Sequence, residues 1–174
     1  MKTLESIVSR GLDKLPNQFA ETARVWMFGL FKVPMLFWLR PYVLELNDER
    51  CRVKIDLNRR SRNHLGSMYF GALAAGADCA GGLMAMALIQ KSGKPVALSF
   101  KDFKANFLKR ADGATVFICE DGPQIQELVA KTLASGEREN LTVKVKAVCP
   151  EKYGDEVLVE FELTLSLKLK SKAA

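Results

Sequence analysis

Alternating apolar and polar side chains run through most of the chain after residue 42. The longest alternating run covers residues 157–169, and shorter ones cover residues 43–46, 51–57, 96–108, 114–120 and 141–149. A strand with one buried face has this period of two. The longest run would span roughly 40 Å when extended, so its sheet must curl. We therefore predict a curled antiparallel sheet with one apolar face.

Residues 71–90 follow a different pattern, with small or apolar side chains on every side of a predicted helix. Such a helix must be enclosed on most of its circumference. Its length approaches that of a membrane span, but Asp78 and four glycines favour a buried core helix. Together the two patterns predict an α+β fold in which the antiparallel sheet wraps around one central apolar helix.

The residues before the first strand are predicted to be helical, over residues 3–14 and 17–33. The second helix has an apolar stripe at positions Phe19, Ala23, Trp26, Met27 and Leu30. The aromatic run at residues 25–39 contains Lys32 and Pro34, so it is too broken to span a membrane. We expect it to stop near Pro34 and lie on the body of the fold. The alternative is an exposed patch that docks on a bilayer or another subunit.

Another amphipathic helix is predicted over residues 123–136, and the alternative is an extended strand at the centre of residues 114–133. The whole chain is then a single domain, with a helical leader (1–41) packed on a sheet-and-helix domain (42–174).

Composition narrows the class of protein. The chain has 174 residues, 48% of them hydrophobic, and a net charge of +6, which is typical of a soluble globular domain. No aromatic-interleaved basic stripe or zinc-finger spacing points to nucleic acid. Four separated cysteines without a CxxC pair, and a start without an apolar signal region, predict a cytoplasmic protein. Membrane association is not expected.

Asp78 is the only charged residue in the predicted central helix, residues 71–90. A buried carboxylate is costly unless it is paired, hydrogen-bonded or protonated. It is either a structural acid bonded to an arginine or to backbone amides, or a group kept for chemistry.

The residues around Asp78 carry a family resemblance. The stretch NHLGSMYFGALAAGAD, residues 63–78, is similar to a motif of the phenylacetyl-CoA-type (PaaI-like) thioesterase branch of the hotdog-fold superfamily. That motif reads Asn-x-x-Gly-x-x-His-Gly-Gly-Ala, with an acid seven residues after the last glycine. Asn63, Gly66, Gly71 and Asp78 match it without gaps. Tyr69 and Phe70 replace its His-Gly.

The resemblance implies an acyl-CoA thioesterase. The amides of Phe70 and Gly71, at a helix N-terminus, would polarise the thioester carbonyl. Asp78 would activate water or attack directly. Asn63 would orient the water or the acid, although a turn residue is the plainer interpretation of RNHLG. Ser99 lies near the strand position of a hydroxyl partner in relatives.

The resemblance also implies partners. Relatives pair their sheets edge to edge, so we expect a homodimer or a dimer of dimers with sites between subunits. Gly66, Tyr69 and Phe70 would contact substrate, and the basic groups at Arg59, Arg60 and Arg62, and at 101–110, are candidates for the coenzyme A phosphates. No metal or redox cofactor is implied, since coenzyme A enters as part of the substrate. The alternative is a non-catalytic acyl or lipid binder, favoured by Phe70 and the aromatic leader.

Overall fold

The computed structural model describes residues 17–170, so the helix expected at residues 3–14 lies outside the described residues. The helices and strands follow one another along the chain as α2 (Asn17–Phe31), α3 (Pro34–Leu39), β1 (Tyr42–Leu46), β2 (Cys51–Ile55), α4 (Phe70–Ser92), β3 (Val96–Phe107), β4 (Thr115–Cys119), α5 (Gly122–Ser135), β5 (Glu139–Val148), α6 (Pro150–Tyr153) and β6 (Val157–Leu169).

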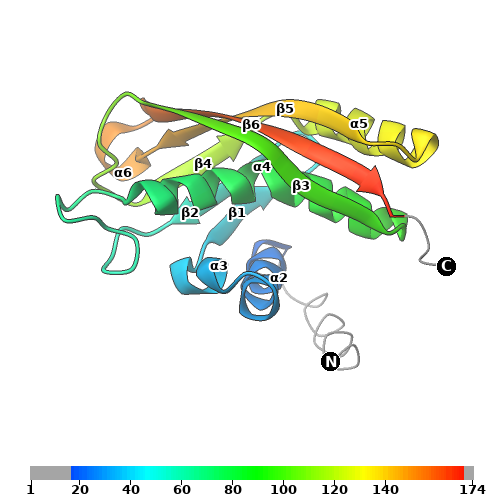
Figure 1. Ribbon diagram of the computed structural model, residues 1–174. Helices are drawn as coiled ribbons and strands as arrows, with labels where there is room; N and C mark the ends of the chain where they lie inside the picture. Colours follow the sequence, from blue (N-terminus) through cyan, green and yellow to red (C-terminus); the bar gives the residue numbers. More distant parts are fainter. Residues whose placement is uncertain (1–16, 171–174) are drawn as a thin grey trace.

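The strands form one antiparallel sheet in the order β1-β2-β4-β5-β6-β3. The sheet curls over one side of α4, and α2 and α3 lie on the opposite side of that helix (Figure 1). The predicted fold, a curled antiparallel sheet around one central helix, is confirmed. The longest alternating run is β6, the 13-residue strand Val157–Leu169.

The sheet and α4 pack closely because α4 carries small residues where large sheet side chains meet it. Phe117 of β4 is fully buried and faces Gly76 of α4. A Cβ atom on Gly76 would lie 2.2 Å from the Cε2 atom of Phe117, which is far inside van der Waals contact. Only glycine allows this approach. In the most apolar 18-residue stretch of α4, 61% is buried inside the fold, as expected for the predicted core helix.

The helices α2 and α3 form a separate layer, which we call the helical layer. Two hydrogen bonds tie α2 to the start of the sheet. The buried N–H of Val43 donates to Thr22 Oγ1 at 2.9 Å, and Trp26 Nε1 donates to the Pro41 carbonyl at 2.7 Å. The first helix ends at Phe31, and Pro34 opens the second. The predicted stop near Pro34 is therefore confirmed.

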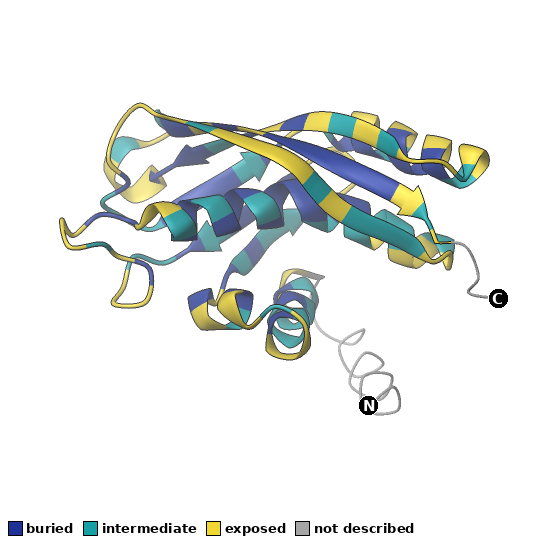
Figure 2. Ribbon diagram, in the orientation of Figure 1, coloured by how far each residue is buried: buried dark blue, intermediate teal, exposed yellow. Residues whose placement is uncertain are grey.

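The orientation of α2 differs from the predicted stripe. Phe19 and Leu30, at the two ends of that stripe, are 67% and 50% exposed, while Val25 is buried. Figure 2 shows exposed residues along the helical layer on the side away from α4. The helix turns this way because Thr22 must reach β1 and because Gly29 packs on α3, where its Cβ would lie 2.5 Å from the Phe37 amide nitrogen.

The strand β3 forms one edge of the sheet. It pairs with β6, and in the described part of the chain no strand pairs with its other side. All 12 of its residues are exposed or half-buried, and Phe103 and Phe107 are 46% and 54% exposed. A long strand edge of this kind is a ready template for another strand.

Candidate active site

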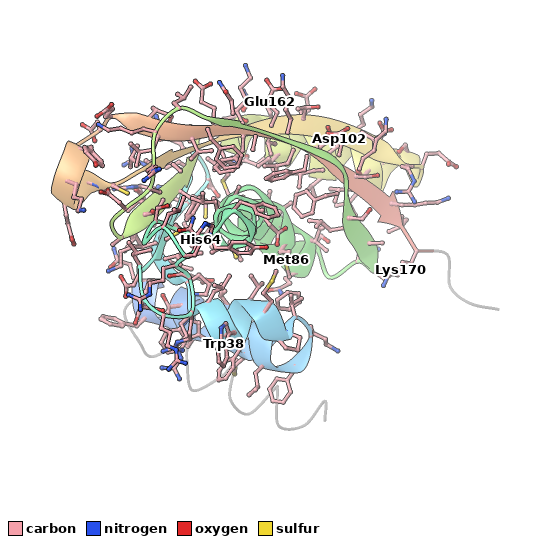
Figure 3. All side chains as sticks on the ribbon, turned by 60° about the vertical axis from the view of Figure 1, so that its left-hand side comes forward. Trp38, His64, Met86, Asp102, Glu162 and Lys170 are labelled. Carbon is pink, nitrogen blue, oxygen red and sulfur yellow. The ribbon has the colours of Figure 1, made fainter. Side chains whose placement is uncertain are left out.

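A cavity of about 230 Å³ lies between the helical layer, α4 and β3. Its walls are mainly apolar, with side chains from all three parts of the fold, among them Val25, Phe28, Leu36, Leu83, Met86, Leu98 and Phe100. In Figure 3 Met86 projects from α4 toward the helical layer. The polar lining residues are Glu21, Arg24, Asp78, Gln90 and Ser99. This is the usual makeup of a small-molecule site, an apolar hollow with a few polar groups.

Asp78 lines this cavity from the third turn of α4. Its carboxylate has no hydrogen bond and no ion pair within residues 17–170. Burial removes the carboxylate from water and raises the pKa of Asp78 to about 6. Among the described residues, then, no arginine or backbone amide pairs with this acid as the ion-paired alternative requires. A carboxylate with such a pKa is mostly ionised at neutral pH and still basic enough to take a proton.

Ser99 of β3 lines the same cavity as Asp78, so the structure brings these two predicted residues together. The Ser99 hydroxyl donates to the Ser166 carbonyl of β6 at 3.3 Å, which is a long hydrogen bond. The hydroxyl oxygen keeps its lone pairs available toward the cavity.

Sequence reasoning missed the ion pair between Glu21 and Arg24 in the cavity wall. These side chains lie one turn apart on α2 and are partly buried. The available signal was an acid and a base at i and i+3 within an otherwise apolar helix, a spacing that places both on one face.

The N-terminus of α4 also has the predicted free amides. Tyr69 is the N-cap and no side chain caps the helix. The N–H of Tyr69 donates to the Ser61 carbonyl and that of Ala72 to the Tyr69 carbonyl, whereas those of Phe70 and Gly71 have no acceptor among the described residues. Free N–H groups at a helix start attract negative charge.

Phe70, which carries one of these amides, lines a second hollow of about 410 Å³ that shares no lining residue with the Asp78 cavity. Phe70 and Leu73 of α4 line it together with Asn63 and the segment that follows β3. Within one chain the predicted site residues therefore fall into two groups. Asp78 and Ser99 form one, and Asn63 and Phe70 form the other.

Asn63 and Gly66 shape a tight turn before α4. Asn63 Oδ1 accepts hydrogen bonds from the amides of Leu65 at 2.9 Å and Ser67 at 3.2 Å. Gly66 has a φ of 79°, in the left-handed region. These contacts match the turn interpretation of Asn63.

Tyr69 and Phe70, which replace the family's His-Gly, do not close the Asp78 cavity. Their rings contact each other, with centroids 4.9 Å apart, and are 50% and 63% exposed. Neither lines the cavity. His64, the sole histidine in the sequence, is exposed on the loop before α4 and does not line the Asp78 cavity.

The three predicted arginines, Arg59, Arg60 and Arg62, are exposed on the loop that leads to α4. The Arg60 guanidinium lies 5.9 Å from the centroid of the Trp38 ring, and its Nη1 donates to the Trp38 carbonyl at 3.4 Å. Arg60 thus lies beside α3. Lys109 and Arg110, from the second basic group, line the hollow at the start of α4.

A family model described as "Domain of unknown function (DUF4442)" matches residues 22–167. A comparison with curated protein sequences gives no match.

Several solved structures share this fold. A Chlorobaculum tepidum protein with unknown function has a TM-score of 0.74 at 12% identity, over 88% of this chain and 97% of its own. A Pseudomonas aeruginosa protein described as a probable thioesterase has a TM-score of 0.67 at 21% identity, over 90% and 97%. A Haemophilus influenzae thioesterase has a TM-score of 0.60 at 13% identity, over 82% and 88%. Together with the sheet wrapped around α4, these likenesses show the hotdog fold.

Proposed function

The chain belongs to the DUF4442 family, and from this premise we propose that it hydrolyses the thioester bond of an acyl-coenzyme A. One observation carries the proposal: Asp78, with a pKa raised by burial to about 6, faces an apolar cavity without any partner in the described residues. An acyl chain fits apolar walls, and a poised carboxylate supplies the base that thioester hydrolysis needs. The description of similar structures as thioesterases supports this choice.

The chemistry follows from these groups. The Asp78 carboxylate takes a proton from water as the water oxygen attacks the thioester carbon. The carbonyl becomes an oxyanion, and two amide donors at the start of α4, Phe70 and Gly71, stabilise it, each by about 3 kcal/mol. The carbon–sulfur bond then breaks, and the proton held by Asp78 passes to the leaving thiolate. Water and thioester are consumed, and a carboxylic acid and a thiol are formed.

This reaction needs a second copy of the chain. Gly71 and Asp78 are about 10 Å apart along the helix axis, and the hollow that Phe70 lines is separate from the Asp78 cavity within one chain. We propose a homodimer in which β3 pairs with the β3 of a second copy, so that each site uses the α4 amides of one copy and Asp78 of the other. Asp102 lies near Lys101 and Lys104 in an exposed stretch, so an antiparallel copy of β3 can meet opposite charge.

Exposed basic side chains surround the start of α4 in this arrangement. Arg59, Arg60 and Arg62 precede the helix, and Lys109 and Arg110 line its hollow. They are our candidates for the phosphates of coenzyme A. The four free cysteines are all buried, which suits a reducing compartment, and we place the activity in the cytoplasm.

A non-catalytic acyl binder is the second candidate. It is favoured by the position of Phe70, whose exposed ring stands beside an amide that would have to contact the thioester carbonyl. In that case the apolar cavity would hold an acyl chain without hydrolysis.

The test is release of free thiol from acyl-coenzyme A substrates of increasing chain length by the purified full chain. We expect turnover with at least one chain length, and a loss of about a hundredfold or more in Asp78→Asn. The matched control is Asp155→Asn, an exposed acid far along the sequence from the cavity lining, which should keep full activity. The wild-type kcat/KM should rise with pH through about 6, as Asp78 ionises.

Two results would reject hydrolysis. One is the absence of turnover on every chain length, and the other is full turnover by Asp78→Asn. Acyl compounds that copurify with an inactive protein would support the binder instead.

A further inference from the structure

Four large apolar side chains project from the helical layer into solvent. Leu30 and Phe31 end α2, and Met35 and Trp38 belong to α3, with exposed fractions of 50%, 49%, 55% and 61%. Trp38 lies on the side of this layer away from the sheet (Figure 3). We call these four side chains the outer apolar patch. So many exposed large apolar groups within nine residues mark an interaction surface.

The charge around the outer apolar patch is positive. Lys32 and Arg40 are exposed within the same segment, and the Arg60 guanidinium lies over the Trp38 ring. Between residues 17 and 44 the sequence has one acid, Glu21, and it forms an ion pair with Arg24 in the cavity wall. No acidic side chain of this segment therefore opposes an anionic partner.

We infer that the outer apolar patch docks on an anionic lipid bilayer, with Leu30, Phe31, Met35 and Trp38 in the interface and Lys32, Arg40 and Arg60 near the lipid phosphates. Aromatic and aliphatic side chains on one surface, flanked by cations, are the features of helices that lie in a membrane interface. The sequence offered bilayer docking of residues 25–39 only as the alternative, and membrane association was not the expectation.

Docking has a consequence for the cavity. Phe28, Val33 and Leu36 come from the helical layer and line the Asp78 cavity, so this layer separates the cavity from the docked surface. An acyl substrate held at a bilayer would then be close to the cavity. This consequence rests on the proposed function, but the docking does not, because vesicle binding is measured without any turnover.

The test is flotation of the purified full chain with vesicles of phosphatidylcholine, alone or mixed with phosphatidylglycerol. We expect about tenfold stronger binding to the anionic vesicles, and weaker binding as salt is raised. The double variant Phe31→Ser with Met35→Ser should bind about tenfold more weakly. Leu65→Ser with Leu108→Ser is the matched control, since these side chains are 57% and 54% exposed elsewhere, and it should bind as the wild type.

Charge and fluorescence give independent readings. Lys32→Glu should weaken binding to anionic vesicles, whereas Lys94→Glu, an exposed lysine of the α4–β3 turn, should not. The sequence has two tryptophans, so Trp26→Phe leaves Trp38 as the single reporter, and its emission should shift to shorter wavelength on anionic vesicles.

Three results would overturn the inference. They are equal binding to neutral and anionic vesicles, wild-type binding by the patch variant, and a patch variant that dissociates an oligomer in solution without any change in flotation. The last would show that a second copy of the chain covers the patch.

Discussion

The two sides of α4 differ in how completely they are filled, although the helix carries small and apolar residues all round. Toward the sheet, Gly76 lies so close to Phe117 that no side chain fits between them. Toward the helical layer, Asp78, Gly82 and Leu83 line a cavity of about 230 Å³. The difference shows how this fold makes a binding space: one face of the central helix packs closely on the sheet, and the other is covered by helices that leave a cavity.

The largest expected effect comes from placing the same side chain on each side of α4. Gly76→Leu forces a branched side chain into the fully buried ring of Phe117, and we expect the free energy of unfolding to fall by more than about 3 kcal/mol. At Gly82 the nearest atom to a Cβ is Phe100 Cζ at 3.3 Å, in the cavity lining. Gly82→Leu should therefore fold. Its free energy of unfolding should fall by less than about 1 kcal/mol, because leucine favours the helix more than glycine does and this offsets part of the crowding.

Denaturant unfolding of Gly76→Leu and Gly82→Leu measures the two changes in the free energy of unfolding. The cavity gives a second reading, since the leucine of Gly82→Leu occupies space that an acyl chain would need and should raise KM or abolish turnover. Equal destabilisation by both substitutions would show that the two sides of α4 are filled alike.

The sequence predicted the sheet and the helix that packs on it well, because the hydrophobic pattern of each element is local. Alternation over residues 157–169 gave the bounds of β6, and the small residues of 71–90 indicated an enclosed helix that the structure extends to Phe70–Ser92. The break at Pro34 was likewise encoded by proline itself. The short α6 was not predicted, as four residues carry too little periodicity.

The open side was harder to predict because it depends on contacts between distant segments. The stripe through Phe19 and Leu30 was visible, but its outward direction follows from the bond between Thr22 and Val43 and from the packing of Gly29 on α3. Likewise the motif identified Asp78 and Asn63 together, whereas the curl of the sheet assigns them to different hollows. Spacing along a chain does not fix such separations.

The second largest expected effect concerns the charge of Asp78, on the side of α4 that faces the cavity. The pKa of Asp78 is raised to about 6, above its value in the unfolded chain, so the native state binds the proton more tightly. Stability from this group is then present below about pH 4 and is lost as pH rises toward 6. At about pH 8 the ionised acid costs the fold on the order of 3 kcal/mol.

Asp78→Asn removes this cost, and we expect it to be more stable than the wild type at about pH 8 by that order of magnitude, with little difference below about pH 4. Denaturant midpoints across this pH range check the prediction, with Asp155→Asn as the exposed control. An Asp78→Asn protein less stable than the wild type at high pH would mean that the carboxylate has a stabilising partner.

The smallest effect concerns how the helical layer is held over the cavity. Thr22→Val keeps the shape of the side chain but removes the acceptor for the buried N–H of Val43, and we expect a loss of about 1 kcal/mol in the free energy of unfolding. Because α2 forms a wall of the cavity, affinity for an acyl ligand should fall as well. The control is Thr142→Val, which removes the 2.8 Å hydrogen bond to Thr164 between β5 and β6, away from the cavity lining. Its stability should fall by a similar amount while ligand affinity stays unchanged, and a parallel loss of affinity in both variants would mean that the cavity depends on the stability of the whole fold and not on the position of α2.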